Sequence, residues 1–424
     1  MTKLADMKFD SFHANNKDYP LGYSLFEDDY EYESDTQIRR SAFDAFSKKL
    51  AQYENTTAAA YNSQVQTEKT MATLRGFESV FDSLLFDQKV SRELYDRQID
   101  LITTKLSVHM RKYARLLKKI HKLDRMTFAD LKISVDPEYD PKVTIEGSKE
   151  YIEKGLSILG PEYVDMVREA YRDRWVDFAK NQGKSTGGFC ASPYGTNSFI
   201  LLSWNDRMAD VFTLAHEMGH SIHTWYSNKN QSYTYSGYKI FVAEVASTCN
   251  EALLIRHLLK NSKDKQEKAY LLNYFLESFR GTLFRQTMFA EFEQKAHEMA
   301  AAGESMTSQS LCNIYKKLNE DYFGPDTVID PEIQYEWERI PHFYTPFYVY
   351  QYATGFSAAI AISRKIFNGE PGILEGYKKF LSGGCSDTPI ELLKLAGVDL
   401  SHTGPVEEAL KFFEELLNEF EELA

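Results

Sequence analysis

The stretch Asp210–Tyr226 reads DVFTLAHEMGHSIHTWY, and it decides how the rest of the sequence is interpreted. His216 and His220 stand four residues apart, so a helix places both imidazoles on one face, one turn apart. That spacing sets two ring nitrogens at bonding distance from one metal ion, and Glu217 can hold a water in the metal's open position. The alternative is an amphipathic helix with two surface histidines, but the flanking residues are apolar, and a buried pair needs partners that a metal supplies.

A second segment, Tyr238–Leu259, reads YKIFVAEVASTCNEALLIRHLL and sets two acids in an apolar helix. A buried carboxylate is costly unless it is paired or bound to a metal. Glu244 follows His220 closely enough for a turn and a returning helix to bring its carboxylate to the same metal, and two histidines with one glutamate are a usual set for catalytic zinc. Glu251, about two turns on, is expected to accept a hydrogen bond from a ligand histidine, with a structural salt bridge as the alternative.

The rest of the chain predicts a mostly α protein with one small β-hairpin. The segment Gly187–Trp204, GGFCASPYGTNSFILLSW, favours a hairpin with strands near Phe189 and Phe199, and Leu131–Val135 is expected to be a short extended piece. Apolar residues at helical spacing predict helices over residues 35–53, 58–82, 91–123, 148–182, 262–301, 308–322 and 406–423.

Composition limits the partners. The 49 basic and 62 acidic residues give a formal charge of −13, which argues against nucleic acid and against anionic lipid. No apolar run reaches the roughly 18 residues of a membrane span, and Met1–Phe12 shows no signal-peptide pattern. The four cysteines lie far apart, which is typical of a protein of the reducing cytoplasm.

HEMGH followed by FVAEVASTCNEAL resembles the M3 family of zinc oligopeptidases, in particular its oligoendopeptidase F branch. The resemblance extends to RRSAFDAF at 39–46, FRQTMFAEFE at 284–293 and IPHFYTPFYVYQYATG at 340–355. It implies a zincin-like fold with the hairpin beside the His-Glu-x-x-His helix. It also implies one Zn²⁺ per chain on His216, His220 and Glu244, and hydrolysis of short peptides with Glu217 as the base.

The same resemblance implies further site residues. His342 and one of the tyrosines at 344, 348, 350 and 352 are expected to stabilise the oxyanion; the pattern around Pro346 favours Tyr350, with Tyr348 as the second choice. Core packing of these aromatics and a structural role for His342 are the alternatives. The substrate is expected to bind along the strand Gly188, Phe189 and Cys190.

Chains of this branch are longer, so residues 1–30, polar and irregular in pattern, are expected to be the remnant of an N-terminal lobe or a linker, and residues 31–424 the catalytic domain. A more open channel and self-association would follow. Two other functions stay open: a non-catalytic peptide-binding fragment and an exopeptidase. The complete set of ligand, base and oxyanion residues favours the endopeptidase.

Overall fold

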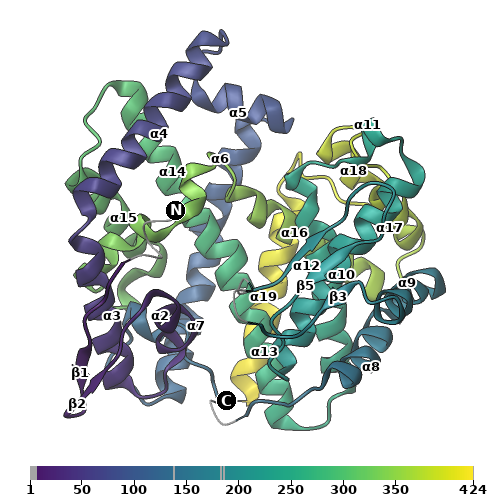
Figure 1. The fold of residues 1–424 in the computed structure, drawn as a ribbon, viewed down its shortest axis with the longest axis horizontal. Coiled ribbons are helices and arrows are strands. Elements are labelled where there is room, and N and C mark those ends of the chain that lie inside the picture. The colour runs from purple at the N-terminus through teal and green to yellow at the C-terminus, as the bar shows by residue number, and fades with distance from the viewer. Residues whose placement is uncertain (1–6, 137–138, 182–183, 185–186, 424) are drawn as a thin grey trace.

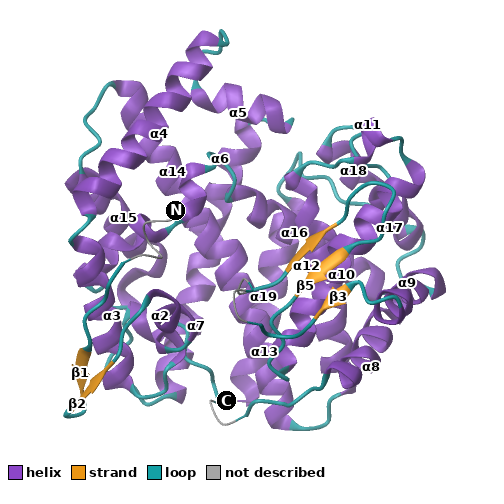
Figure 2. Cartoon of the chain, in the orientation of Figure 1, coloured by secondary structure: helices purple, strands orange, loops and turns teal. Residues whose placement is uncertain are grey.

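The computed structural model describes residues 7–136, 139–181, 184 and 187–423, and it is mostly helical with a small sheet (Figure 2). The predicted fold class, mostly α with a small sheet beside the His-Glu-x-x-His helix, is confirmed. The helices are α2 (Tyr23–Asp28), α3 (Thr36–Ala51), α4 (Glu54–Leu74), α5 (Val80–Gln88), α6 (Arg92–Leu101), α7 (Ser107–Ile120), α8 (Ile145–Leu156), α9 (Pro161–Arg172), α10 (Met208–Asn230), α11 (Tyr233–Ser236), α12 (Ile240–Asn261), α13 (Lys265–Ser278), α14 (Arg285–Ala302), α15 (Ser308–Phe323), α16 (Tyr350–Phe367), α17 (Ile373–Leu381), α18 (Pro389–Leu395) and α19 (Gly404–Leu423).

Figure 1 shows two groups of helices, with α3 to α7, α14 and α15 in one group and α8 to α12, α17 and α18 in the other. One continuous core of buried apolar side chains runs through both groups. Helix α12 of the second group packs extensively on both α10 and α16. No helix in the described ranges is long and apolar enough to cross a membrane.

Several predicted helices are interrupted. The range 58–82 divides into α4 and α5, because Gly76 takes a left-handed φ of 81° just after α4. The predicted helices 91–123 and 262–301 each contain a π-helical segment, Ile102–Leu106 in the first and Phe279–Phe284 in the second. Such segments often occur near functional sites, and Thr282 of the second one lines the cavity described below.

The range 148–182 departs furthest from its prediction. Gly160, with φ 94°, separates α8 from α9, and Pro161 occupies the first turn of α9, where its missing N–H costs nothing. The helix ends at Arg172, so the prediction is wrong beyond that residue; Gln182 lies outside the described residues.

The small sheet has the strand order β3 (Val176–Asp177), β5 (Phe199–Leu201), β4 (Phe189–Ala191). The predicted hairpin forms as an antiparallel pair in which Cys190 faces Ile200, and β3 adds to it in parallel. The expected extended piece at Leu131–Val135 is wrong: the segment consists of a turn and a bend, which follow the short helix Phe128–Asp130.

The described residues before α3 are ordered, which corrects the expectation of an irregular start. A hairpin, β1 (Phe12–Ala14) with β2 (Lys17–Tyr19), and helix α2 pack on α3. The ring of Phe46 stacks on Phe26 with centroids 4.0 Å apart, at the centre of this small apolar cluster. Residues 1–6 lie outside the described residues, and the assignment of 1–30 to a lobe remnant or linker stays a prediction.

Candidate metal centre and its cavity

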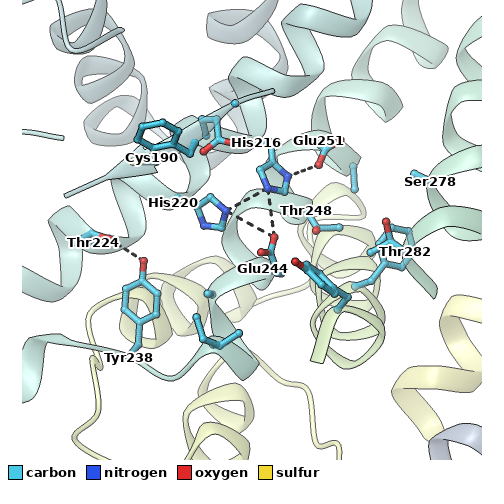
Figure 3. A pocket seen from close by; sticks show the side chains of 18 of the residues that line it. Cys190, His216, His220, Thr224, Tyr238, Glu244, Thr248, Glu251, Ser278 and Thr282 are labelled. Atoms are coloured by element: carbon cyan, nitrogen blue, oxygen red, sulfur yellow. Dashed lines mark hydrogen bonds and ion pairs between the residues drawn. The ribbon is translucent and has the colours of Figure 1, made fainter. Parts of the chain in front are cut away.

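The site begins with a close crossing of α10 and α12. A Cβ atom on Gly219 would lie 2.5 Å from Ser247 Cα, so only glycine permits the two backbones to approach this closely. Asn250 Nδ2 donates a hydrogen bond to the carbonyl of Ala215, 3.0 Å away, and fixes the pair of helices. The crossing places Glu244 of α12 opposite the two histidines of α10 (Figure 3).

Three potential ligand atoms converge there. His216 Nε2 and His220 Nε2 lie 3.2 Å apart, and Glu244 Oε2 lies 3.3 Å from the first and 3.7 Å from the second. Ligands bound tetrahedrally to Zn²⁺ at about 2.1 Å are separated by about 3.4 Å, so the spacing of these atoms fits one ion of that size. Among the described residues, this is the group of His, Cys, Asp and Glu side chains that could hold a metal.

Two further side chains orient the ligands. His216 Nδ1 donates to Glu251 Oε1 at 2.6 Å, so its Nε2 is the ring atom that is directed toward the other potential ligand atoms. The Ser247 hydroxyl donates to Glu244 Oε2 at 3.1 Å. Both hydrogen bonds fix the positions of the potential ligand atoms without the help of a metal ion.

The electrostatics of the cluster favour a positive charge between its members. Burial opposes ionisation of Glu244, but its contacts with His216 and His220 prevail and hold its pKa down at about 2. Burial lowers the pKa of His220 to about 4, with the charge of His216 acting in the same direction, so this imidazole stays neutral at pH 7 with its Nε2 directed into the cluster. A neutral imidazole beside an ionised carboxylate is the form in which both groups bind metals.

Glu217 lies beside this cluster, and one oxygen of its carboxylate accepts no hydrogen bond from the described residues. Its side chain is buried, and among the described residues Oε2 has no hydrogen-bond partner. Burial raises the pKa of Glu217 to about 7. A carboxyl group of that basicity, facing a cavity, can both accept and return a proton near neutral pH.

The cluster opens into a cavity of about 710 Å³. On one side it is walled by the start of β4, where a Cβ on Gly188 would meet Thr213 Cγ2 at 3.0 Å and Glu217 Oε1 at 3.4 Å. In the described part of the chain, β4 pairs with β5 alone, so its other edge is free to face a bound peptide. The remaining walls come from α10, α12, α13 and α16 and from the segments that directly precede α12 and α16. They include Thr224, Tyr238, Thr248, Ile255, Phe275, Ser278, Tyr348, Tyr352 and Phe356.

Two tyrosines reach this cavity from the segment before and at the start of α16. Tyr348 and Tyr352 both line it, and the Tyr352 hydroxyl donates to that of Tyr348 at 3.4 Å. His342 stacks on Tyr348 with ring centroids 5.8 Å apart and meets Tyr352 edge-on at 6.1 Å. The structure thus brings His342 against the two tyrosines of this segment that line the cavity.

Comparison with known proteins assigns the family. The model of "Peptidase family M3" matches residues 30–412. The chain belongs to peptidase family M3. It is 45% identical over 388 residues to Oligopeptidase PepF of Bacillus subtilis and 41% identical over 386 residues to an oligoendopeptidase F homolog of Lactococcus lactis. These matches include 91% of the chain but only 58% and 64% of the respective relatives.

Solved structures agree with the family assignment. The oligoendopeptidase-F of Enterococcus faecium superposes on 99% of the M3 chain with a TM-score of 0.79 and 34% identity, and the match covers 69% of that protein. A Chlamydophila abortus protein superposes with a TM-score of 0.91 and 33% identity. The resemblance to this branch of the M3 family, and the zincin-like fold expected from it, are therefore confirmed.

Tyr350 lies apart from this M3 site, which corrects the expected register of the tyrosine segment. Its ring is 1% exposed and does not line the cavity, and its hydroxyl donates to Gln88 Oε1 of α5 at 2.5 Å. Since Tyr350 begins α16, Tyr352 lies two positions further along the helix and points in a different direction from it. Of the four tyrosines at 344, 348, 350 and 352, the two that line the cavity are therefore Tyr348, the second choice from sequence, and Tyr352.

Sequence reasoning also missed the packing that holds the M3 site together. A Cβ on Gly355 would lie 3.2 Å from Glu244 Cβ, so α16 presses on α12 directly behind the third ligand. Gly219 and Gly355 lie within quoted motifs, HEMGH and YATG, and a glycine inside a helical pattern was the available signal of close helix contact. Thr248 and Tyr238, which also line the cavity, carry no comparable signal.

Proposed function

We propose that the protein is a zinc-dependent endopeptidase that hydrolyses short peptides. The observation that carries the proposal is the convergence of His216, His220 and Glu244 on one point, beside the unpartnered carboxylate oxygen of Glu217. The relatives named oligopeptidase or oligoendopeptidase F support it, although the chain spans less than two thirds of the two Bacillus and Lactococcus proteins.

The donor set fits zinc, with His216, His220 and Glu244 as the three protein ligands and one open position. When bound, a zinc ion supplies Lewis-acid polarisation of the scissile carbonyl and a water of lowered pKa. Glu251 and Ser247 keep their hydrogen bonds to the ligands in this arrangement.

The chain's own groups move the protons. Glu217 accepts a proton from the attacking water and returns it to the leaving amine, which is the role its raised pKa and free oxygen suit. Tyr348 and Tyr352 present hydroxyls to the same cavity, and we assign the oxyanion contact to Tyr348, with His342 supporting its ring from behind.

The free edge of β4 binds the substrate backbone. An extended peptide can add as a strand along Gly188, Phe189 and Cys190, next to Glu217. The cavity lies between helices and β4 and holds about 710 Å³, which admits a few extended residues and is far too small for a folded domain. Short peptides are therefore the substrate class.

The decisive experiment combines peptide digestion and metal analysis. Peptides of graded length are incubated with the protein and read by mass spectrometry, with and without a chelator, and elemental analysis counts zinc in the intact chain and in Glu244→Ala. We expect about one zinc per chain, chelator-sensitive cleavage inside the peptides, and much weaker zinc retention in the variant. Binding without cleavage would indicate a peptide-binding module, cleavage from the ends an exopeptidase, and full zinc in Glu244→Ala would remove that residue from the ligand set.

A further inference from the structure

Phe347, which directly precedes Tyr348, has a backbone conformation that its residue type disfavours. Its φ is 53°, in the left-handed region where a bulky side chain is strained, and its side chain is fully buried. Its ring is surrounded by aromatic rings at centroid distances of 4.6 Å from Phe81, 5.0 Å from His297 and 5.5 Å from Tyr95. Something in the surrounding structure has to hold this conformation against its strain.

Side chains from three helices bond both backbone groups of Phe347. Its N–H donates to Glu293 Oε1 of α14 at 2.7 Å. Its carbonyl accepts from Gln88 Nε2 of α5 and from Gln351 Nε2 of α16, each at 3.0 Å. The peptide groups on both sides of the Phe347 Cα are thereby fixed in direction, and with them the Cα–Cβ bond of Tyr348.

From this geometry we infer that Glu293 is a positioning residue, which aims Tyr348 into the metal cavity by holding the N–H of Phe347. The inference rests on the proposed function only in the role it gives to Tyr348; the placement of that ring is a property of the fold. Glu293 itself does not line the cavity and touches no potential metal ligand among its described contacts.

The burial of Glu293 shows why its acceptor oxygen matters. The side chain is 1% exposed, and within the described part of the chain its second oxygen, Oε2, has no hydrogen-bond partner. Burial raises the pKa of Glu293 to about 8, so the carboxyl carries a proton at pH 7. An unpartnered buried oxygen is costly, and a leucine would fill a similar volume without it. A leucine, however, cannot accept a hydrogen bond from the N–H of Phe347, and this acceptor is what Glu293 provides.

The test compares Glu293→Leu, which fills the space without an acceptor, with Glu293→Gln, which keeps an oxygen at the same reach. The direct readout is the ¹⁹F NMR shift of 3-fluorotyrosine placed at position 348, measured in zinc-free and zinc-loaded protein. We expect Glu293→Leu to move or broaden this resonance and Glu293→Gln to leave it in place. In turnover of a short peptide, Glu293→Leu should lower kcat at least about tenfold, with KM and zinc content within about twofold of the parent protein.

A matched control lies on the same helix. Glu298→Ala removes an exposed ion pair with Arg92 and should change neither the resonance nor kcat. If the resonance stays in place in Glu293→Leu, or if Glu293→Gln perturbs it equally, the positioning role is refuted. Because the NMR readout needs no hydrolysis, a protein that cleaves no peptide would refute the proposed function while leaving this inference open to the same measurement. Should Glu293→Leu fail to fold, the Gln88→Leu variant tests the contact on the other side of Phe347, with the same resonance expected to move.

Discussion

Two differently built walls line one cavity. The helical wall consists of α10 and α12, which carry the potential metal ligands, and the irregular wall is the tyrosine segment that leads into α16. On α10 and α12 every site residue lies on a regular helix, and the four-residue spacing of His216 and His220 fixes which face they share. The segment from residue 340 to 349 consists of one short 3₁₀ helix, Pro341–Tyr344, and a turn that contains the left-handed residue Phe347, before α16 begins. Side chains of α5 and α14 form tertiary hydrogen bonds with the backbone of Phe347 in this segment.

The difference explains where the sequence was informative. On a helix the sequence spacing is also a spatial spacing, so three potential ligands and Glu251 could be named from the printed residues, and the structure places them together. In the tyrosine segment, the two-residue spacing of the tyrosines does not predict where their side chains point, because the backbone dihedral angles change from one residue to the next. The experiments below separate the two walls, beginning with the largest expected effect.

The first concerns the helical wall. Glu217→Gln keeps the shape of the side chain but cannot accept a proton, so kcat should fall by at least about 100-fold, equivalent to about 2.7 kcal/mol or more in the barrier. Zinc content and the thermal unfolding midpoint should stay close to those of the parent protein. Turnover assays with elemental analysis check both. Near-native turnover would mean that another group acts as the base.

The same contrast holds for the fold as a whole. The helical class, the hairpin at Phe189 and Phe199 and the terminal helix followed from periodicity and turn residues. The interruptions did not, because a glycine in a helical pattern is compatible both with a continuing helix and with a left-handed helix end, and Gly76 adopts the second. The two-residue strand β3 is too short to show alternation, and it exists because β5 offers it an edge.

The second experiment turns to the irregular wall. Tyr348→Phe removes a hydroxyl from the cavity, and loss of one oxyanion donor costs about 3 kcal/mol in the barrier, or about 100-fold in kcat. KM should change much less, since the contact strengthens only in the transition state. Steady-state kinetics on one peptide series measures both constants. A variant in which KM rises and kcat stays constant would assign Tyr348 to substrate binding instead.

The third experiment changes a residue of the helical wall that contacts a potential metal ligand but is not a ligand itself. Glu251→Ala removes the acceptor of the His216 Nδ1 proton, so the imidazole loses its fixed orientation and part of its basicity. Zinc affinity should fall about 10- to 100-fold, measured by competition with a fluorescent chelator. Activity at saturating zinc should recover largely, which distinguishes this variant from Glu217→Gln. Unchanged affinity would make Glu251 a structural ion pair, the alternative that the sequence left open.

The smallest effect tests the corrected register within the irregular wall. Tyr350→Phe removes the hydrogen bond to Gln88 Oε1, while Gln88 keeps its bond to the carbonyl of Phe347. The free energy of unfolding should drop by about 1 kcal/mol, the usual net contribution of one such bond, and kcat should stay within about twofold. Tyr113→Phe is the matched control, because it also removes a buried tyrosine hydroxyl, one bonded to Asn273 and Glu277. Urea denaturation and turnover are measured on both variants. Comparable losses in the free energy of unfolding, with unchanged kcat, would assign Tyr350 to the core. A fall in kcat of tenfold or more in Tyr350→Phe alone would show that its hydroxyl reaches the substrate, and the tyrosine segment would then have to rearrange when peptide binds.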